Sequence, residues 1–320
     1  MGKGIADKRI YLLINPQAAG GAARSWWEKE RPRLDEAQID YFWDFTEASG
    51  SAGVQIRRAV TQKGAQAVVI VGGDGSLFDA VNGILDNGRL CRDDLILSAY
   101  PVGSGCDFAR TLSTGSRPSL TELICQGRVE LTDVGCCEHA TADGKTARHY
   151  FLNSFDMGAG ADTCVLVNAG GGRIKRFTRN GKAAFLLSAL KVLLTYRYTD
   201  TVVEADGMTF SGQYIIAGAA NGKYIGGGMM MFPEASISDG KLDLLLVERR
   251  SKLNIFRTFP KIYSGRHLQQ PGITYVKASN IRISTRRPVN IELDGEVPGC
   301  TDVSLSVLPG VLPLLRADKD

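Results

Sequence analysis

The first third of the chain alternates short aliphatic and β-branched runs with longer amphipathic stretches. This alternation restricts the fold more than any other feature, because it is typical of a parallel sheet flanked by helices. We expect strands over residues 9–14, 39–45, 67–71 and 95–100. Each expected strand is followed by a polar or glycine-rich loop. In open α/β sheets the loops after the strands lie along one edge, where ligands bind.

From about residue 129 onward the pattern changes to alternating runs interrupted by Asp-Gly pairs, which are typical of antiparallel hairpins. The pairs are at residues 143–144, 206–207, 239–240 and 294–295. Apolar residues at helical spacing predict two helices, over residues 183–196 and 253–264. We therefore predict an α/β domain over residues 1–130 and a mainly β domain over residues 131–305. The last part of the chain, about residues 306–320, is expected to pack back onto the first domain.

The composition excludes several classes of protein. The apolar fraction of 44% and the charged fraction of 22% are ordinary for a globular protein, and the net charge of +4 is too small for a nucleic-acid-binding domain. Seven cysteines without a CxxC pair favour reduced thiols. A metal site at Cys136, Cys137 and His149 is an alternative, but the usual paired spacing is absent. No apolar run reaches the roughly 18 residues of a membrane span, and we expect a cytoplasmic protein.

The segment Gly72-Gly73-Asp74-Gly75-Ser76 follows a predicted buried strand and precedes a predicted helix. Its glycines allow the main chain to approach a phosphate, and the N–H groups at a helix start attract anions. Asp74 would repel a phosphate unless a cation stood between them, which points to Mg²⁺ or to a sugar contact. The P-loop pattern GxxxxGK[ST] is absent. A tight turn without a ligand is the alternative interpretation.

The loop from Pro101 to Arg110 repeats this arrangement one strand further along the chain. Gly103 opens the main chain, Ser104 offers a hydroxyl group, and Asp107 enters the first turn of a helix. A plain helix-start carboxylate is the alternative for Asp107. Read as a dinucleotide fingerprint the loop lacks the third glycine, so an NAD or flavin oxidoreductase is a remote alternative.

Taken together, these segments resemble the diacylglycerol kinase catalytic-domain family, lipid kinases whose nucleotide-binding half is related to NAD kinases. The resemblance runs nearly end to end. It implies an NAD kinase-like α/β nucleotide-binding domain followed by a C-terminal antiparallel β-sandwich domain. The segments that carry it are NPQAAGG (15–21), Thr46, GGDGS (72–76), YPVGSGCDFAR (100–110), FLNSFDMGAGAD (151–162), GGGMMMFPEASISDGKLDLLLV (226–247) and LDGE (293–296).

The resemblance implies an ATP-dependent kinase that transfers the γ-phosphoryl group to a lipid hydroxyl, with diacylglycerol as acceptor and phosphatidic acid as product. Asp74 and Asp107 would act through Mg²⁺, and Asp294 and Glu296 match the positions of the general base. The family pattern places the following residues at the ATP site: Asn15, Thr46, Gly72, Gly73, Asp74, Gly75, Ser76, Gly103 and Ser104.

A second, structural Mg²⁺ site is implied at Asp239, to which the main-chain carbonyls of Ser236 and Lys241 would add oxygen ligands. The chain departs from the family at Cys106 and Phe78, where Asn is common, so an amide is missing at each position. Three alternatives stay open: a kinase for another lipid, a kinase for a soluble acceptor such as NAD, and a catalytically silent nucleotide- or lipid-binding homologue.

A basic segment without acidic residues, Gly170 to Lys182, precedes an apolar stretch. A lipid kinase must contact an anionic membrane surface, and such a segment predicts this contact. A solvated loop ahead of a core helix is the alternative. We expect the protein at the inner face of the cytoplasmic membrane, with a homodimer left open. The basic residues are Arg173, Lys175, Arg176, Arg179 and Lys182.

Overall fold

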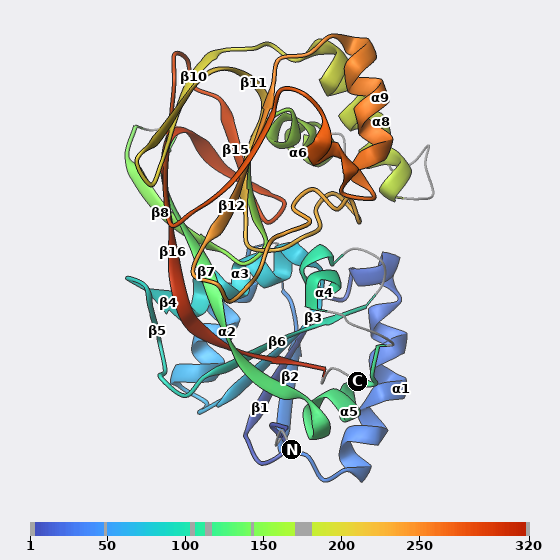
Figure 1. Cartoon of the computed structure of the whole chain (residues 1–320). Helices are drawn as coiled ribbons and strands as arrows, with labels where there is room; N and C mark the ends of the chain where they lie inside the picture. The colour runs from blue at the N-terminus through green and yellow to red at the C-terminus, as the bar shows by residue number, and fades with distance from the viewer. Residues whose placement is uncertain are drawn as a thin grey trace. The chain divides into compact units, whose positions relative to one another are not determined.

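The structure is a computed structural model that describes residues 4–47, 50–102, 106–112, 117–141, 144–169 and 181–317. The chain divides into two compact units. Unit 1 holds the residues up to Val134 and those from Pro309 onward, and unit 2 is Gly135–Leu308. The predicted fold class, α/β followed by mainly β, is confirmed (Figure 1).

Unit 1 is built on a parallel sheet in the order β6-β3-β1-β2. Its strands lie within two residues of the expected ones at either end, because buried parallel strands are continuous apolar runs. A further parallel pairing joins β6 to the C-terminal end of β16 through Leu314 and Leu315. The bounds are β1 (Ile10–Ile14), β2 (Tyr41–Phe45), β3 (Ala67–Gly72), β6 (Ile96–Pro101) and β16 (Glu296–Arg316).

Helices cover both faces of this sheet. α1 (Ala23–Glu36) and α5 (Leu120–Gln126) bury the face that carries Ile10, Leu12 and Ile14. α2 (Ala52–Thr61) and α3 (Asp74–Ile84) pack against each other and against β1 and β3, and so cover the opposite face. The short helix α4 (Asp107–Leu112) follows β6, and a small hairpin, β4 (Leu85–Asp86) and β5 (Arg89–Leu90), follows α3.

The strand pairs described within unit 2 are antiparallel, and the strand order is β13-β12-β11-β10-β14-β16. β9 pairs with β11 and β15, β15 pairs with β16, and β7 pairs with β8. The bounds are β7 (Arg128–Ala140), β8 (Thr146–Phe151), β9 (Ser154–Gly158), β10 (Asp200–Ala205), β11 (Met208–Ala220), β12 (Leu242–Glu248), β13 (Ile273–Ala278), β14 (Asn280–Thr285) and β15 (Asn290–Leu293).

Three α-helices of unit 2 are described. The predicted helices correspond to α8 (Gly181–Thr195) and α9 (Lys252–Ile262), which pack together. α6 (Ala159–Ala169) was not expected from the sequence. Its first residues are small, and its apolar residues follow no clear helical stripe, so the periodicity that reveals an amphipathic helix is missing.

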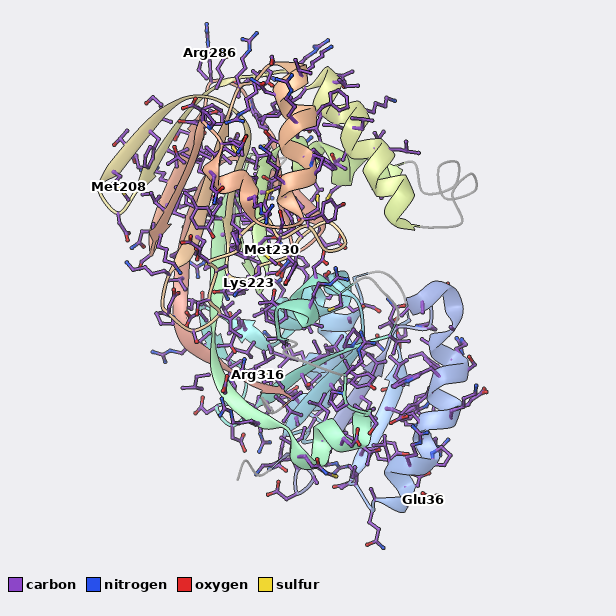
Figure 2. The ribbon with its side chains drawn as sticks, turned by 45° about the vertical axis from the view of Figure 1, so that its right-hand side comes forward. Glu36, Met208, Lys223, Met230, Arg286 and Arg316 are labelled. Carbon is purple, nitrogen blue, oxygen red and sulfur yellow. The ribbon has the colours of Figure 1, made fainter. Side chains whose placement is uncertain are left out.

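Two Asp-Gly pairs form the hairpin turns that the sequence predicts. Asp206-Gly207 joins β10 to β11, beside Met208 (Figure 2), and Asp294-Gly295 joins β15 to β16; all four residues have positive φ. The hairpin predicted at Asp239-Gly240 is wrong. This pair lies in the long connection between β11 and β12, and only its glycine has positive φ, whereas a type I′ turn requires it at both positions. Asp143 lies outside the described residues.

All seven cysteines are free thiols. Among the residues that the structure describes, no three His, Cys, Asp or Glu side chains are grouped as metal ligands. Within the same ranges no helix has the length and apolarity needed to cross a bilayer.

Candidate active site

The carboxyl ends of β1, β2 and β3 bring three predicted ATP-site residues together. Ile14 is in register with Phe45 on one side and Val71 on the other, so Asn15 and Thr46 follow their strands beside Gly72, the last residue of β3. Main-chain hydrogen bonds fix them: the Asn15 N–H donates to Val71 O (2.9 Å) and the Thr46 N–H to Ile14 O (2.9 Å).

The glycine loop is held against Asn15. The Asn15 Nδ2 donates to the Ser76 Oγ at 3.3 Å. A Cβ at Gly72 would lie 3.1 Å from that hydroxyl and 3.3 Å from the Asn15 Cβ, so glycine permits the close approach. Gly73, Asp74 and Gly75 continue from this point into α3. Gly103 and Ser104 lie outside the described residues, and the ATP-site roles of the whole set stay predictions.

Asp74 links the glycine loop to the start of α4. Its Oδ2 accepts the Asp107 N–H at 2.8 Å, and its Oδ1 accepts the Phe108 N–H at 3.2 Å. A carboxylate at a helix start satisfies N–H groups that have no partner within the helix. Asp74 therefore holds Asp107, the next predicted acid, beside it.

Two carboxyl groups thus lie next to each other away from bulk solvent: Asp107 is only 5% exposed, and Asp74 is partly buried. Burial, together with the charge of Asp107, raises the pKa of Asp74 to about 6. A divalent cation would offset this accumulation of negative charge, and Mg²⁺ is usually held by one or two carboxylates, waters and substrate phosphates. Asp74 and Asp107 fit that description.

Cys106 supplies a donor at a position where the sequence pattern lacks an amide. Its Sγ lies 3.3 Å from the Asp74 Oδ1. Burial and the charge of Asp74 raise the pKa of this thiol well above its usual value, so it remains protonated and can donate. Phe78 is buried on α3, 7% exposed, and its carbonyl accepts the Asn82 Nδ2. The departure at Cys106 therefore retains a hydrogen bond, whereas the departure at Phe78 adds to the core.

In unit 2, the turn between β15 and β16 presents two carboxylates with different surroundings. Asp294 is 4% exposed and accepts three main-chain N–H groups, from Leu152 (2.8 Å), Asn153 (2.9 Å) and Ser154 (2.9 Å). These bonds tie the hairpin to the turn between β8 and β9. Such a carboxylate positions the hairpin and is poorly placed to accept a substrate proton.

Glu296 is exposed at the first position of β16 and pairs across the turn with Leu293. The turn is further fixed by Glu292, which accepts the Gly295 N–H. An exposed carboxylate on a rigid turn suits a general base. Of the two acids that the sequence predicts for this role, Glu296 has the suitable surroundings.

Two acids near this hairpin were missed by the sequence prediction. Asp156 on β9 is in register with Glu292 on β15, and both are buried. Burial, together with Glu292, Asp156 and Glu296, raises the pKa of the Cys164 thiol, so these groups share one neighbourhood. Gly160 makes room for Asp156, because a Cβ there would lie 1.8 Å from its Oδ2. The only sequence signal was the position of Asp156 within FLNSFDMGAGAD.

At the predicted structural metal site, the ammonium group of Lys277 contacts Asp239. The Lys277 Nζ lies 2.7 Å from the Asp239 Oδ2 and 3.3 Å from the Asp243 Oδ2, and donates to Glu234 O at 3.1 Å. The other Asp239 oxygen accepts the Lys241 N–H at 3.1 Å. A metal ion on Asp239, Ser236 and Lys241 would have to displace Lys277. The residues as they stand do not fit the ion, and the site stays a prediction.

The predicted membrane-contact residues cannot be placed in the same way. Arg173, Lys175, Arg176 and Arg179 lie outside the described residues, and Lys182 is described for its main chain alone.

Both units match known families. Residues 9–137 match the diacylglycerol kinase catalytic domain. Residues 157–316, half of the chain, match the YegS C-terminal NAD kinase beta sandwich-like domain. These matches, with a glycine loop at the edge of a parallel sheet and a carboxylate hairpin in a β domain, define a two-domain phosphotransferase.

Individual proteins agree with this class. A diacylglycerol kinase of Bacillus subtilis (strain 168) is 24% identical over 305 residues, 91% of either chain. A probable lipid kinase YegS-like of Alcanivorax borkumensis is 23% identical over 314 residues, 97% of either chain. The fold is that of a putative diacylglycerol kinase from Bacillus anthracis, with a TM-score of 0.75 at 22% identity over 97% of this chain and 95% of that one.

The chain belongs to the diacylglycerol kinase catalytic-domain family of lipid kinases. The predicted family and the predicted enzyme class, a kinase that phosphorylates an alcohol group of a lipid, are confirmed. Membership of this kinase family implies ATP as the phosphoryl donor.

Proposed function

We propose that the protein transfers the γ-phosphoryl group of ATP to the hydroxyl group of diacylglycerol, giving phosphatidic acid. The observation that carries this proposal is the pair of carboxylates on the β15–β16 turn. Asp294 is locked by three main-chain N–H groups, while Glu296 beside it is exposed and able to take a proton. The acceptor is proposed from the family, several of whose curated members are named diacylglycerol kinase.

Phosphoryl transfer depends mainly on positioning and charge neutralisation. The loop at Gly72–Ser76 and the side chain of Asn15 support binding of the ATP phosphates at the ends of β1 and β3. Asp74 and Asp107 would hold Mg²⁺, which when bound neutralises phosphate charge. Glu296 takes the proton of the acceptor hydroxyl while the hydroxyl oxygen attacks the γ-phosphorus atom, and ADP leaves.

The test is ADP release by the purified protein with Mg²⁺, ATP and detergent-dispersed acceptors. We expect release with diacylglycerol and a loss of 100-fold or more in Glu296→Gln, because general-base catalysis contributes roughly 10² to 10⁴. The panel includes monoacylglycerol, a sphingoid base and NAD. Turnover with NAD and none with lipids, or ATP binding without turnover on any acceptor, would contradict the proposal.

We also propose that α8 and α9 dock the enzyme onto an anionic bilayer. Exposed apolar side chains recur at helical spacing on both helices: Leu187 (57% exposed) and Leu194 (36%) on α8, and Leu253 (58%), Phe256 (47%) and, just beyond the helix end, Tyr263 (51%) on α9. Neither helix contains an acidic residue. Apolar residues accompanied by lysines and arginines suit an interfacial surface, and each cation contributes about 1 kcal/mol near anionic lipid.

Vesicle sedimentation tests this docking surface. We expect Leu253→Glu with Phe256→Glu to reduce binding to vesicles containing phosphatidylglycerol at least ten-fold, with little effect on turnover of a short-chain, water-soluble acceptor. Val202→Glu is the matched control, because Val202 is 41% exposed on β10, outside this surface. Equal binding by the double variant and the control would contradict the proposal.

A further inference from the structure

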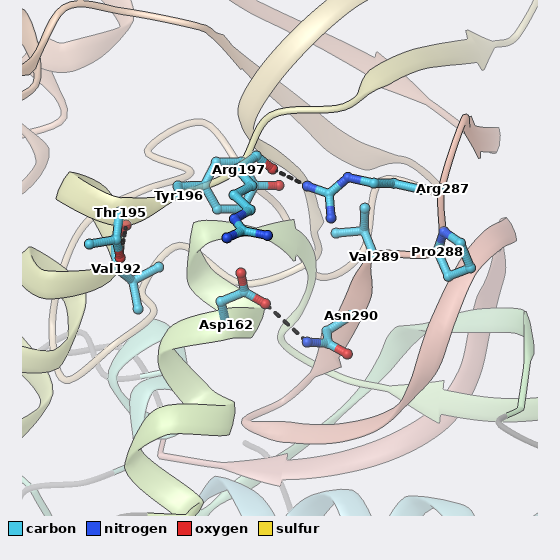
Figure 3. Close-up of a pocket in the computed structure, with 9 residues that line it drawn as sticks. All are labelled: Asp162, Val192, Thr195, Tyr196, Arg197, Arg287, Pro288, Val289 and Asn290. Carbon is cyan, nitrogen blue, oxygen red and sulfur yellow. Dashed lines mark hydrogen bonds between the residues drawn. The ribbon is translucent and has the colours of Figure 1, made fainter.

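A cavity of about 280 Å³ in unit 2 has no role in the proposed reaction. It lies between α6, the residues that follow α8, and the connection from β14 to β15 (Figure 3). Arg197 and Arg287 line it from two different segments. Arg287 donates to the main-chain carbonyl of Arg197, which holds the two segments together. Each of these side chains is directed toward the cavity in Figure 3.

The cavity carries an excess of positive charge. Among the residues that the structure describes, neither guanidinium has a carboxylate partner. One carboxylate, Asp162 on α6, also lines the cavity, and its Oδ1 accepts the Asn290 Nδ2 at 3.0 Å. Two guanidinium groups, both on exposed residues, therefore line this open pocket together with one carboxylate, of which one oxygen is used by Asn290.

The Tyr196 hydroxyl lies behind this lining, beside Gly158, where a Cβ would come within 3.3 Å of it. The Tyr196 oxygen is inaccessible to solvent and has no hydrogen-bond partner within the described part of the chain. Burial and the charges of Asp162 and Asp156 raise the pKa of this phenol, so it stays protonated. The accessible lining thus combines two guanidinium donors with a single carboxylate acceptor.

We propose that this cavity binds a phosphate group that retains one proton, either as inorganic phosphate or as a phosphate monoester. Guanidinium groups match phosphate oxygens in geometry and charge. A carboxylate in an anion site opposes sulfate and phosphodiesters, which have no proton to donate at neutral pH. A phosphate with a P–OH group can donate to Asp162, so Asp162 acts as the specificity residue.

The position of the cavity connects it to the catalytic turn. Val289 and Asn290 line the cavity, and the same strand, β15, ends at Leu293, the cross-turn partner of Glu296. Three residues of strand correspond to about 10 Å. The product of the proposed reaction is a phosphate monoester, so the product itself could bind in this cavity. That consequence rests on the proposed function, whereas the binding of phosphate does not.

Isothermal titration calorimetry with inorganic phosphate tests the site, with excess ADP present to occupy the nucleotide loops. We expect saturable phosphate binding in the millimolar range or tighter, and a loss of at least ten-fold in phosphate affinity in Arg197→Gln and in Arg287→Gln. Arg286→Gln is the matched control: Arg286 is the sequence neighbour of Arg287, is 83% exposed and lies at the outer edge of the unit (Figure 2). The phosphate affinity of Arg286→Gln should stay within two-fold of that of the wild type.

Specificity provides the second readout. Sulfate at equal ionic strength should bind at least ten-fold more weakly than phosphate, and Asp162→Asn should remove that difference. Dihexanoyl phosphatidic acid compared with dihexanoyl phosphatidylglycerol distinguishes a lipid monoester from free phosphate as the occupant. Phosphate affinity unchanged in both arginine variants, no saturable binding by the wild type, or equal binding of sulfate and phosphate would overturn the proposal. None of these measurements requires turnover.

Discussion

Two carboxylates on one turn, Asp294 and Glu296, have opposite surroundings, and substitution should separate their roles. Asp294→Asn leaves an amide N–H facing a main-chain N–H, which should cost about 1 to 3 kcal/mol of unfolding free energy and also lower activity. Glu296→Gln should abolish most activity while leaving the melting temperature nearly unchanged. Thermal unfolding and ADP release on the same preparations provide the comparison. Full stability of Asp294→Asn would show that the three N–H bonds do not anchor the turn.

The partly buried carboxyl group of Asp74 should make the stability of the protein depend on pH. Because burial raises its pKa from 3.8 to about 6, the folded state holds the proton more tightly than the unfolded state. The free energy of unfolding should therefore fall as pH rises from about 4 to about 6, by on the order of 2 to 3 kcal/mol. Urea denaturation of the nucleotide-free protein from pH 4 to 7 measures this change.

Asp74→Asn removes the titrating group, so its stability relative to the wild type should increase over that pH interval. Asp74→Ala serves as the control, since it loses the hydrogen bonds as well. The free energy of unfolding of Asp74→Ala should be lower than that of Asp74→Asn at every pH. The difference between Asp74→Ala and the wild type should nevertheless change with pH in the same way. Parallel curves for the wild type and both variants would rule out a raised pKa at Asp74.

At the scale of elements, the connection from β11 to β12 is tied to β13 by Lys277. Lys277→Ala would leave Asp243, which is fully buried, without its cation, and should cost about 1 to 3 kcal/mol. Millimolar Mg²⁺ should restore part of that loss in the variant, because the vacated carboxylates could then take a metal ion.

Lys241→Ala is the matched control, since Lys241 pairs with Asp206 at the surface, and it should lose less than about 1 kcal/mol. Differential scanning fluorimetry with and without Mg²⁺ gives the readout. Mg²⁺ that stabilised the wild type and Lys277→Ala equally would contradict the role given to Lys277.

Elements were predictable where one local pattern decides the structure. The strands of unit 1 are short apolar runs between polar loops, and the Asp294-Gly295 turn combines a turn dipeptide with flanking strands. α6 was not predictable, because its small residues give no helical periodicity. The Asp239-Gly240 segment was predicted wrongly, because no strand directly precedes it with which a hairpin could form. Asp156 and Glu292 meet only through strand pairing between distant parts of the chain, which no local pattern reveals.

At the scale of the whole molecule, unit 1 depends on the last strand of the chain. Leu314 is fully buried and lies beside Leu97, and the Ser98 Oγ donates to Leu315 O at 3.1 Å. Leu314→Ala should therefore cost about 2 to 5 kcal/mol, and it should act on unit 1. Hydrogen exchange should increase in β6 before it increases in β12.

Leu131→Ala is the control for this substitution, because Leu131 is 61% exposed, and it should change stability by less than about 0.5 kcal/mol. If hydrogen exchange in Leu314→Ala became faster in β12 but not in β6, the end of β16 would not stabilise the parallel sheet.

The participation of β16 in both units has a consequence for synthesis on the ribosome. Domains near the start of a chain usually fold while the rest is still being translated. Here the strand that pairs with β6 is made after all of unit 2. At elongation rates of roughly 5 to 20 residues per second it follows Val134 by on the order of 10 to 35 seconds. During that interval the edge of β6 lacks its partner. The nascent nucleotide-binding half therefore has an exposed strand edge, where a chaperone would be expected to act.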